Sequence, residues 1–295
     1  MHFNIRRLNP AIGAEITNCD LREPLSADTA SAIYQAWLDS NGLLVVRDQH
    51  LEPQHQVAFA SIFGELSGPE RKVGGAWSEM RNTHALPEFP QITRMSNKKD
   101  EQGRPLGRVD AGTFWHTDLA TRQIPGKASC LYAIEIPPYG GDTMFASMIA
   151  AYDALSPLFQ ERLEGLEAVH TLAKVYGNQM TGGMMGEENE VKHNSAIHPV
   201  IRQHPDTGRK SIFVDRGFTT QIEGLNKAES DALLEFLFEH STQPQFIYRH
   251  QWRTNDLLIW DNRCTIHYAV SDYKGIGWRY MHRCTIRGNA DIPTT

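Results

Sequence analysis

The sequence predicts a mainly β fold with flanking helices, arranged as an antiparallel sandwich or barrel. The second half of the chain contains many short strand-like segments, with few helical patterns between them to serve as parallel crossovers. With 40% hydrophobic and 22% charged residues in a chain of 295, there is enough apolar material for a large core. No linker-like shift in composition divides the sequence, so we expect a single domain over residues 1–295.

The first strong helical pattern covers residues 26–41. Ile33 and Trp37 are four residues apart and share one helix face, Ser26 can cap the start, and an Asn-Gly pair ends the segment. The apolar run at residues 43–46 then predicts a short buried strand.

Further helices are predicted from their start signals: a proline in the first turn, a Ser-Pro pair, and an Asn followed three residues later by Glu. These helices cover residues 53–63, 156–163 and 226–240. The further predicted strands cover residues 91–96, 128–136, 143–145, 246–252, 257–260, 265–268 and 279–286.

Two long irregular stretches interrupt these elements, near residues 67–90 and 175–195. Both are rich in Gly, and the second also contains several Met residues. Long stretches without secondary structure inside a compact chain are usually functional or disordered. We interpret both as lids that exclude water from a reactive site, with plain surface disorder as the alternative.

Charge and cysteine usage exclude several classes of protein. A net charge of −6 argues against a broad nucleic-acid surface, which needs an excess of Lys and Arg. The four Cys residues are scattered without a C-x-x-C pair, which rules out a cysteine-built zinc site and disfavours a disulfide framework. Because the chain has 13 His residues but only four scattered Cys residues, we expect any metal to be held by imidazole and carboxylate groups.

The N-terminal segment and the hydropathy pattern predict a cytoplasmic protein without membrane contact. No apolar segment follows the early arginines as it does in a secretory signal. No apolar run approaches the ~18 residues that a membrane-spanning helix needs.

The candidate metal ligands begin with His116 and Asp118. In a strand, residues i and i+2 point to the same face, so this pair offers an imidazole beside a carboxylate. With His267, which lies in a later apolar strand, the pair makes the facial triad of non-haem Fe(II) oxygenases. The alternatives are a chance H-x-D and a core histidine. Iron is favoured because no H-E-x-x-H zinc motif is present, although zinc remains chemically possible.

Two arginines and a threonine form the candidate anion site. Arg279 and Arg283 are four residues apart, so in a strand they share a face, and burying them there requires anionic partners. The alternative is a solvated strand face. The tight Gly140-Gly141 turn delivers the Thr143 hydroxyl to the start of a strand.

At these residues the sequence resembles the Fe(II)/2-oxoglutarate-dependent taurine / 2,4-dichlorophenoxyacetate dioxygenase family. The similarity runs along almost the whole chain, through motifs at residues 12–16 (IGAEI), 20–25 (DLREPL), 63–66 (FGEL), 115–118 (WHTD), 137–143 (PPYGGDT), 198–200 (HPV), 260–263 (WDNR) and 281–283 (MHR). The resemblance implies a double-stranded β-helix, or jelly-roll, flanked by helices.

The resemblance also implies roles for the candidate residues. His116, Asp118 and His267 match the iron ligands, and Thr143 and Arg279 match the residues that hold the far carboxylate of 2-oxoglutarate. The implied reaction uses Fe(II), 2-oxoglutarate and O2, hydroxylates a substrate, and releases succinate and CO2.

For the substrate, Arg283 matches an arginine that lies near the substrate anion, and Leu119, Tyr176 and Phe218 are the expected pocket wall. The polar residues that grip taurine in the taurine enzyme have no counterpart here, so taurine itself is disfavoured. We therefore expect a small organic carboxylate or sulfonate with an apolar body. Family members are commonly oligomeric, which allows a homo-oligomer.

Two other functions compete with this one. A jelly-roll metalloenzyme such as a hydrolase or isomerase could use the same triad without 2-oxoglutarate, but it has no dicarboxylate for Arg279 and Thr143 to hold. A non-catalytic metal-binding module is the other alternative, and the intact set of three ligands argues against it.

Overall fold

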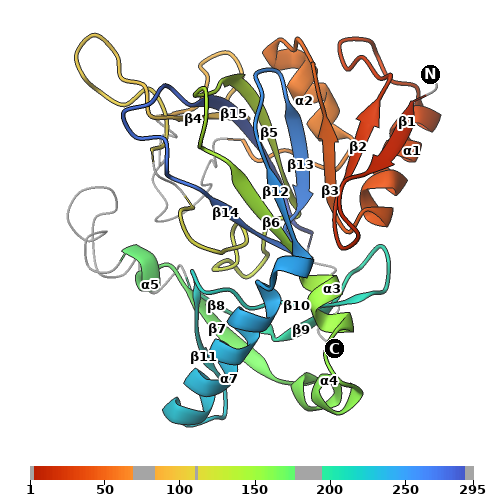
Figure 1. The fold of residues 1–295 in the computed structure, drawn as a ribbon, viewed down its shortest axis with the longest axis vertical. Coiled ribbons are helices and arrows are strands. Elements are labelled where there is room, and N and C mark those ends of the chain that lie inside the picture. The colour runs from red at the N-terminus through yellow and green to blue at the C-terminus, as the bar shows by residue number, and fades with distance from the viewer. Residues whose placement is uncertain (1–2, 69–83, 110–111, 177–194, 290–295) are drawn as a thin grey trace, which may run out of the picture.

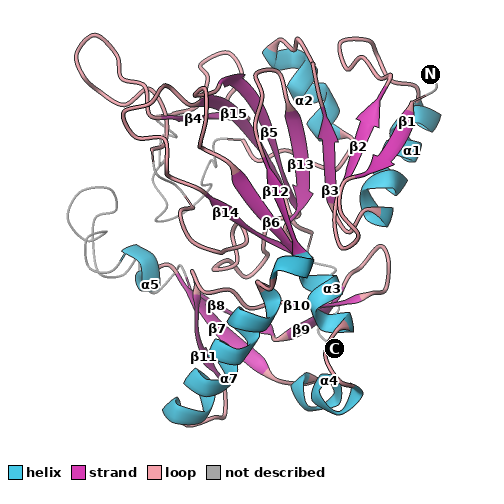
Figure 2. Cartoon of the chain, viewed as in Figure 1, coloured by secondary structure: helices cyan, strands magenta, loops and turns pink. Residues whose placement is uncertain are grey.

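The computed structural model describes residues 3–68, 84–109, 112–176 and 195–289, and its centre is a sandwich of two antiparallel-rich sheets (Figures 1 and 2). The larger sheet has the order β1 (Asn4–Arg7), β2 (Ala14–Thr17), β3 (Leu43–Val46), β13 (Leu257–Asp261), β5 (Ala128–Glu135), β15 (Tyr280–Ile286) and β4 (Ile92–Ser96). The smaller sheet has the order β12 (Ile247–His250), β6 (Thr143–Ser147) and β14 (Thr265–Ala269). This architecture confirms the predicted jelly-roll.

The central strands of the larger sheet are buried on both faces. In β3, Leu43 and Val45 join Phe145 of the smaller sheet in the core between the two sheets. Leu44 and Val46 instead belong to the core on the opposite face, which also holds side chains of α1 (Ala27–Asp39) and α2 (Pro53–Ser61). A continuous apolar run is what a strand covered on both faces requires.

A second group of elements lies below the sandwich in Figure 1. It contains the three-stranded sheet β11 (Thr219–Ile222), β7 (Glu167–Thr171) and β8 (Ser195–Pro199), and the pair β9 (Ile201–Gln203) and β10 (Lys210–Ile212). The helices here are α3 (Met148–Asp153), α4 (Pro157–Leu163), α5 (Ala173–Tyr176) and α7 (Lys227–Ser241), followed by the 3-10 turn η2 (Pro244–Phe246). An apolar core under α3 and α7 joins this group to β6 and β14.

The predicted helices begin where their caps were expected. The side chains of Ser26, Ser156 and Asn226 each accept a hydrogen bond from a backbone N–H in the first turn. Strands β1, β2 and β7–β11 were not predicted, because they are short and, in the case of β1, exposed along the whole length. The four cysteines are free and buried.

Three predicted strand assignments need correction. His116 forms only an isolated bridge with His267, and Asp118 lies in a turn, so the H-x-D pair is not on a strand. The segment expected to be a strand from residue 246 starts with the 3-10 turn and ends at His250. Arg279 precedes β15 instead of lying in it.

The proposed lids fall mainly on residues 69–83 and 177–194, which lie outside the described residues. Near the first of them, Ala85 forms a bridge with Thr93 of β4, so residues next to the gap pair with the sheet. In the described ranges, no helix combines the length and apolar character needed to span a membrane.

Candidate functional site

The three predicted metal ligands converge between the two sheets. His116, Asp118 and His267 each place one ligand atom within 4.8 Å of those of the other two. β14, which carries His267, is an edge strand of the smaller sheet, and its free edge pairs with the segment around His116. The backbone N–H groups of the two histidines each donate to the other's carbonyl, at 3.1 and 2.8 Å, which brings the ring centroids to 4.1 Å.

Both imidazoles are neutral and therefore able to ligate a metal. Burial is the main cause that lowers the pKa of His116, and it lowers the pKa of His267 to about 3. His116 Nδ1 lies 2.8 Å from the Phe114 carbonyl oxygen, which can only accept, so Nδ1 carries the proton and Nε2 keeps its lone pair. Nδ1 of His267 is buried and has no hydrogen-bond partner among the described residues.

Asp118 is held as a carboxylate. Burial alone would raise its pKa, but the charge of Arg283 and a hydrogen bond from Ser129 help to lower the pKa well below its usual range. Arg283 Nη1 lies 3.6 Å from Asp118 Oδ1, and Ser129 Oγ lies 2.6 Å from Asp118 Oδ2. The carboxylate is thus ionised, with a hydrogen bond on Oδ2 and a positive charge near Oδ1.

Two neutral imidazoles and one carboxylate fit a non-haem Fe(II) centre, because this donor set leaves three coordination positions open. The buried, unpartnered nitrogen of His267 also fits a site that is completed by a bound group.

A second buried cluster, of His204, Asp261 and Cys264, has the donor types of a metal site but a different role. The Arg263 guanidinium contacts both oxygens of Asp261, at 2.8 and 2.6 Å, and His204 lies 2.9 Å from the second of them. Because a cation already occupies this carboxylate, we interpret the cluster as a structural ion-pair network.

The predicted 2-oxoglutarate residues meet at the start of β6. Arg279 donates through Nε to the Gly141 carbonyl at 3.1 Å and through Nη2 to Thr143 Oγ1 at 3.4 Å. Trp252 donates to the same Thr143 oxygen at 2.9 Å. Arg279 is only 8% exposed, and its two side-chain hydrogen-bond partners in the described part of the chain are neutral. A small cavity of about 30 Å³ lies against it, lined also by Thr113.

The backbone around this arginine depends on glycine. Gly140 and Gly141 adopt positive φ values of 77° and 71°, as the predicted tight turn requires. A Cβ atom on Gly141 would lie 3.2 Å from Arg279 Cδ, tighter than an ordinary contact. The turn therefore both positions Thr143 and leaves room for the guanidinium.

The predicted substrate residues are only partly brought together. Arg283 reaches Asp118, and the Phe218 ring lies 5.8 Å from that of His116. Leu119 directly follows Asp118 with a φ of 62°, in a conformation that side chains rarely adopt. Tyr176 is the last residue of α5, next to the undescribed residues 177–194, so its place in the pocket stays a prediction.

Three residues at the site were not predicted. Phe114 packs edge-on against Phe218 at 5.6 Å and lies 5.0 Å from the His116 ring. It fits there because Gly217 has no side chain, since a Cβ at that position would come within 2.4 Å of the Phe114 ring. Ser129 contacts Asp118 and Asn262 contacts Ser129, and both side chains are buried. Asn262 lies in the WDNR motif, but neither residue was assigned a role at the site from the sequence.

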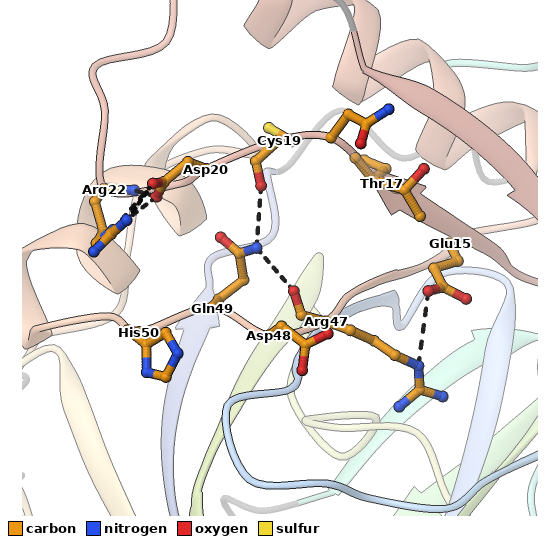
Figure 3. A pocket seen from close by; sticks show the side chains of 11 residues that line it. Glu15, Thr17, Cys19, Asp20, Arg22, Arg47, Asp48, Gln49 and His50 are labelled. Carbon is orange, nitrogen blue, oxygen red and sulfur yellow. Dashed lines mark hydrogen bonds and ion pairs between the residues drawn. The ribbon is translucent and has the colours of Figure 1, made fainter.

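The largest open hollow among the described cavities, of about 560 Å³, is not at this site (Figure 3). It lies beside β2 and the segment after β3, and none of the predicted site residues line it. Several polar groups in it pair with one another: Gln49 donates to the Cys19 and Arg47 carbonyls, and Arg22 pairs with Asp20. We therefore assign no ligand to this hollow.

Comparisons with known proteins show the family of this chain. The family model described as "Taurine catabolism dioxygenase TauD, TfdA family" matches residues 4–285. The alpha-ketoglutarate-dependent 2,4-dichlorophenoxyacetate dioxygenase of Cupriavidus pinatubonensis (strain JMP 134 / LMG 1197) is 35% identical over 265 residues, 88% of this chain and 89% of that protein.

Two solved structures are similar over nearly the full length. A putative alpha-ketoglutarate-dependent taurine dioxygenase from Burkholderia xenovorans gives a TM-score of 0.80 at 30% identity, covering 98% of this chain and 90% of that chain. The protein AAD-2, in complex with Mn(II) and N-oxalylglycine, gives a TM-score of 0.78 at 31% identity and covers 100% of both chains.

Proposed function

Because the chain belongs to the taurine catabolism dioxygenase TauD, TfdA family, we propose that His116, Asp118 and His267 hold its iron and that Arg279 and Thr143 hold its cosubstrate. The protein is an Fe(II)- and 2-oxoglutarate-dependent dioxygenase that hydroxylates a small organic substrate and releases succinate and CO2. The iron, when bound, supplies the activation of O2 that lets an unreactive C–H bond be oxidised.

At the proposed iron site, the chain supplies neutral donors and one negative charge. His116 presents Nε2 because the proton on Nδ1 is held by the Phe114 carbonyl. The carboxylate of Asp118 remains ionised beside Arg283. The aromatic neighbours Phe218 and Trp260, with ring centroids 5.8 Å from His116 and 4.9 Å from His267, restrict the tilt of the two rings and keep water from the imidazoles.

At the proposed cosubstrate site, Thr143 and Arg279 act together. Thr143 Oγ1 accepts from both Trp252 and Arg279, so its two lone pairs are used and its proton is left to donate. A carboxylate beside Arg279 would accept a hydrogen bond from the Thr143 hydroxyl and also lie next to the positive charge of the guanidinium. This arrangement supports the far carboxylate of 2-oxoglutarate as the ligand.

For the substrate we propose a small organic carboxylate or sulfonate with an apolar body. The observation that carries this is Arg283, whose Nε is buried without a hydrogen-bond partner among the described residues. It lies beside Asp118, and the apolar rings of Phe114 and Phe218 flank His116 at the same centre. The named relatives support both anion types, since one is a 2,4-dichlorophenoxyacetate dioxygenase and another a putative taurine dioxygenase.

A substrate panel tests this proposal. We expect succinate release above the uncoupled background with at least one of the aryloxyalkanoates, alkylsulfonates or sulfate esters. The matched neutral amide of an active carboxylate should be inactive. Arg283→Gln should raise the substrate KM by about 10- to 100-fold, the cost of losing a charge-assisted hydrogen bond, and leave the KM for 2-oxoglutarate much less changed. The absence of turnover with every anion would refute the anionic substrate.

The cosubstrate site has a separate test. Anaerobic addition of Fe(II) and 2-oxoglutarate should give the weak visible charge-transfer band of the chelate, and His116→Ala should abolish it. Arg279→Ala should raise the 2-oxoglutarate concentration needed for half of the band by about 10- to 100-fold. Arg249→Ala is the control, because Arg249 pairs with Asp142 near the same turn but is half exposed, so its loss should change little. A band that develops equally in Arg279→Ala would contradict the assignment.

We further propose a single domain over residues 1–295, a cytoplasmic location without nucleic-acid or membrane partners, and assembly, if any, as a homo-oligomer. The net charge of −6 supports the absence of a nucleic-acid partner, and the buried free cysteines support the cytoplasmic location. The three ligands support the domain proposal, because they come from segments far apart in the chain yet meet at one centre.

A further inference from the structure

Behind the carboxylate of Asp118 lies a chain of two hydrogen bonds that leads away from the metal ligands. Ser129 Oγ lies 2.6 Å from Asp118 Oδ2, and Asn262 Nδ2 lies 3.2 Å from Ser129 Oγ. Ser129 is 0% exposed and Asn262 is 1% exposed, so water does not substitute for either contact. Burying two polar side chains is costly unless each of them makes hydrogen bonds to a partner.

The direction of the hydrogen bonds follows from the chemistry of the groups. An ionised carboxylate only accepts, so the Ser129 hydroxyl must donate to Asp118. The Ser129 oxygen is then left as an acceptor, and it requires the amide NH2 of Asn262 to face it. If the amide were turned over, its oxygen would compete for the Ser129 proton, and Asp118 would lose its donor.

The backbone of Asn262 is held through both its N–H and its carbonyl, which places its side chain next to Ser129. Its N–H donates to the Lys127 carbonyl at 2.9 Å, and its own carbonyl accepts from Thr117 Oγ1 at 2.7 Å. Thr117 separates the two ligands His116 and Asp118 in sequence, so the same residue braces the ligand turn and holds the hydrogen-bond chain in place. The amide oxygen of Asn262 is buried without a partner among the described residues. This unsatisfied acceptor costs free energy, but in this orientation the NH2 group can donate to Ser129.

We infer that Ser129, oriented by Asn262, is a positioning residue that turns Asp118 so that only Oδ1 faces the metal. Oδ1 is the oxygen near His116 Nε2, at 3.8 Å, and near Arg283, whereas Oδ2 is the oxygen bound by Ser129. Holding one oxygen away preserves the open positions that the cosubstrate and O2 need. This inference rests on the proposed function, because it assigns Asp118 to the iron.

The test measures metal binding apart from turnover. We expect Ser129→Ala to weaken Fe(II) and Co(II) affinity by about 10- to 100-fold in anaerobic titrations, as loss of a partner of a metal ligand does, and to shift the charge-transfer band of the 2-oxoglutarate chelate. Ser129→Thr keeps the hydroxyl and should retain most of the affinity. Ser241→Ala is the matched control, because Ser241 is equally buried but lies at the end of α7 away from the ligands.

Asn262→Asp is the second variant, and it decides the outcome if Ser129→Ala does not fold. The new carboxylate would accept the hydrogen bond of the Ser129 hydroxyl, so Ser129 would no longer donate to Asp118. Metal affinity should therefore again fall at least tenfold. A folded Ser129→Ala or Asn262→Asp protein that binds Fe(II) within about threefold of the parent would overturn the inference. Retention of metal by His116→Ala would instead refute the proposed iron site itself, so the two failures are distinguishable.

Discussion

The chemistry at the site depends on how single side chains are held by their neighbours. Asp118 is gripped by Ser129 on one oxygen and approached by Arg283 on the other. Arg279 is likewise held by a carbonyl and a hydroxyl, which leaves its charge uncompensated in a buried place. Each of these groups meets a partner that restricts its rotation, so little ordering cost remains when a ligand binds.

At this scale, Gly141 is a sensitive position. Gly141→Ala places a Cβ 3.2 Å from Arg279 Cδ on a backbone with φ of 71°, so we expect the arginine to shift and the KM for 2-oxoglutarate to rise several-fold. Steady-state kinetics with varied 2-oxoglutarate measure this effect.

The control for this substitution is Gly165→Ala. Gly165 has a φ of 79°, and a Cβ added to it would have no atom within 4 Å, so it shares the backbone cost of about 1 kcal/mol without touching the site. Equal effects of the two substitutions on the KM would show that the close contact with Arg279 is unimportant.

Among the elements, α7 shows how local signals define a helix whose packing is tertiary. The Asn226 side chain accepts from the Glu229 N–H at 3.1 Å, and the Glu229 carboxylate accepts from the Asn226 N–H at 3.1 Å. The buried residues Leu234, Leu237 and Phe238 then join the core that α7 shares with α3 and β6. The cap sets where the helix starts, and the apolar stripe sets which face is buried.

Removing the cap should destabilise the protein without affecting the site. We expect Asn226→Ala to lower the free energy of unfolding by about 1 kcal/mol, because the capping hydrogen bond at the helix start is lost. Denaturant unfolding measures this change. Lys227→Ala removes only an exposed ion pair with Asp231 and should cost less than about 0.5 kcal/mol. A larger loss in Lys227→Ala than in Asn226→Ala would contradict the assignment of the cap.

Across the whole molecule, buried neutral histidines couple the fold to pH. Burial is the main cause that lowers the pKa of His170 to about 3 and that of His198 to about 4, and the charge of Arg202 lowers both further. His198 and Lys174 add to the effect on His170. The two imidazole rings are neighbours, with centroids 5.4 Å apart, in the sheet below the sandwich.

The direction of the pH dependence follows from these shifts. Below about pH 6.5 the unfolded chain protonates His170 while the folded chain does not, so the unfolded state binds more protons and stability falls as the pH falls. The contribution of His170 to the free energy of unfolding is fully present above about pH 6.5. Between about pH 6.5 and about pH 3 it falls by about 1.4 kcal/mol per pH unit.

Denaturant unfolding of the metal-free protein at pH 7, 6 and 5 measures this dependence. His170→Asn keeps a hydrogen-bond acceptor for Thr219 but cannot be protonated, so its stability should change less with pH than that of the parent. An identical slope in the two proteins would show that His170 does not contribute.

Much of the fold and of the site was predictable from local pattern. The helix starts at Ser26, Ser156 and Asn226 were confirmed because a cap depends on residues only three positions away. The buried strands were recognisable from continuous apolar runs. The unpredicted strands β7–β11 are short, and much of their pairing joins residues distant in sequence, so no local period marks them.

The sequence by itself determined the mainly β class, the caps, and the residue types of a metal and anion site, because these depend on neighbours along the chain. Only the tertiary structure decided that His116 pairs with His267 through a single bridge in place of a strand, and that Ser129 and Asn262 stand behind Asp118. Those contacts join segments far apart in sequence, and which hydroxyl meets which carboxylate is set by the register of the sheets. A pattern along one strand carries no information about that register until the partner strand is in place.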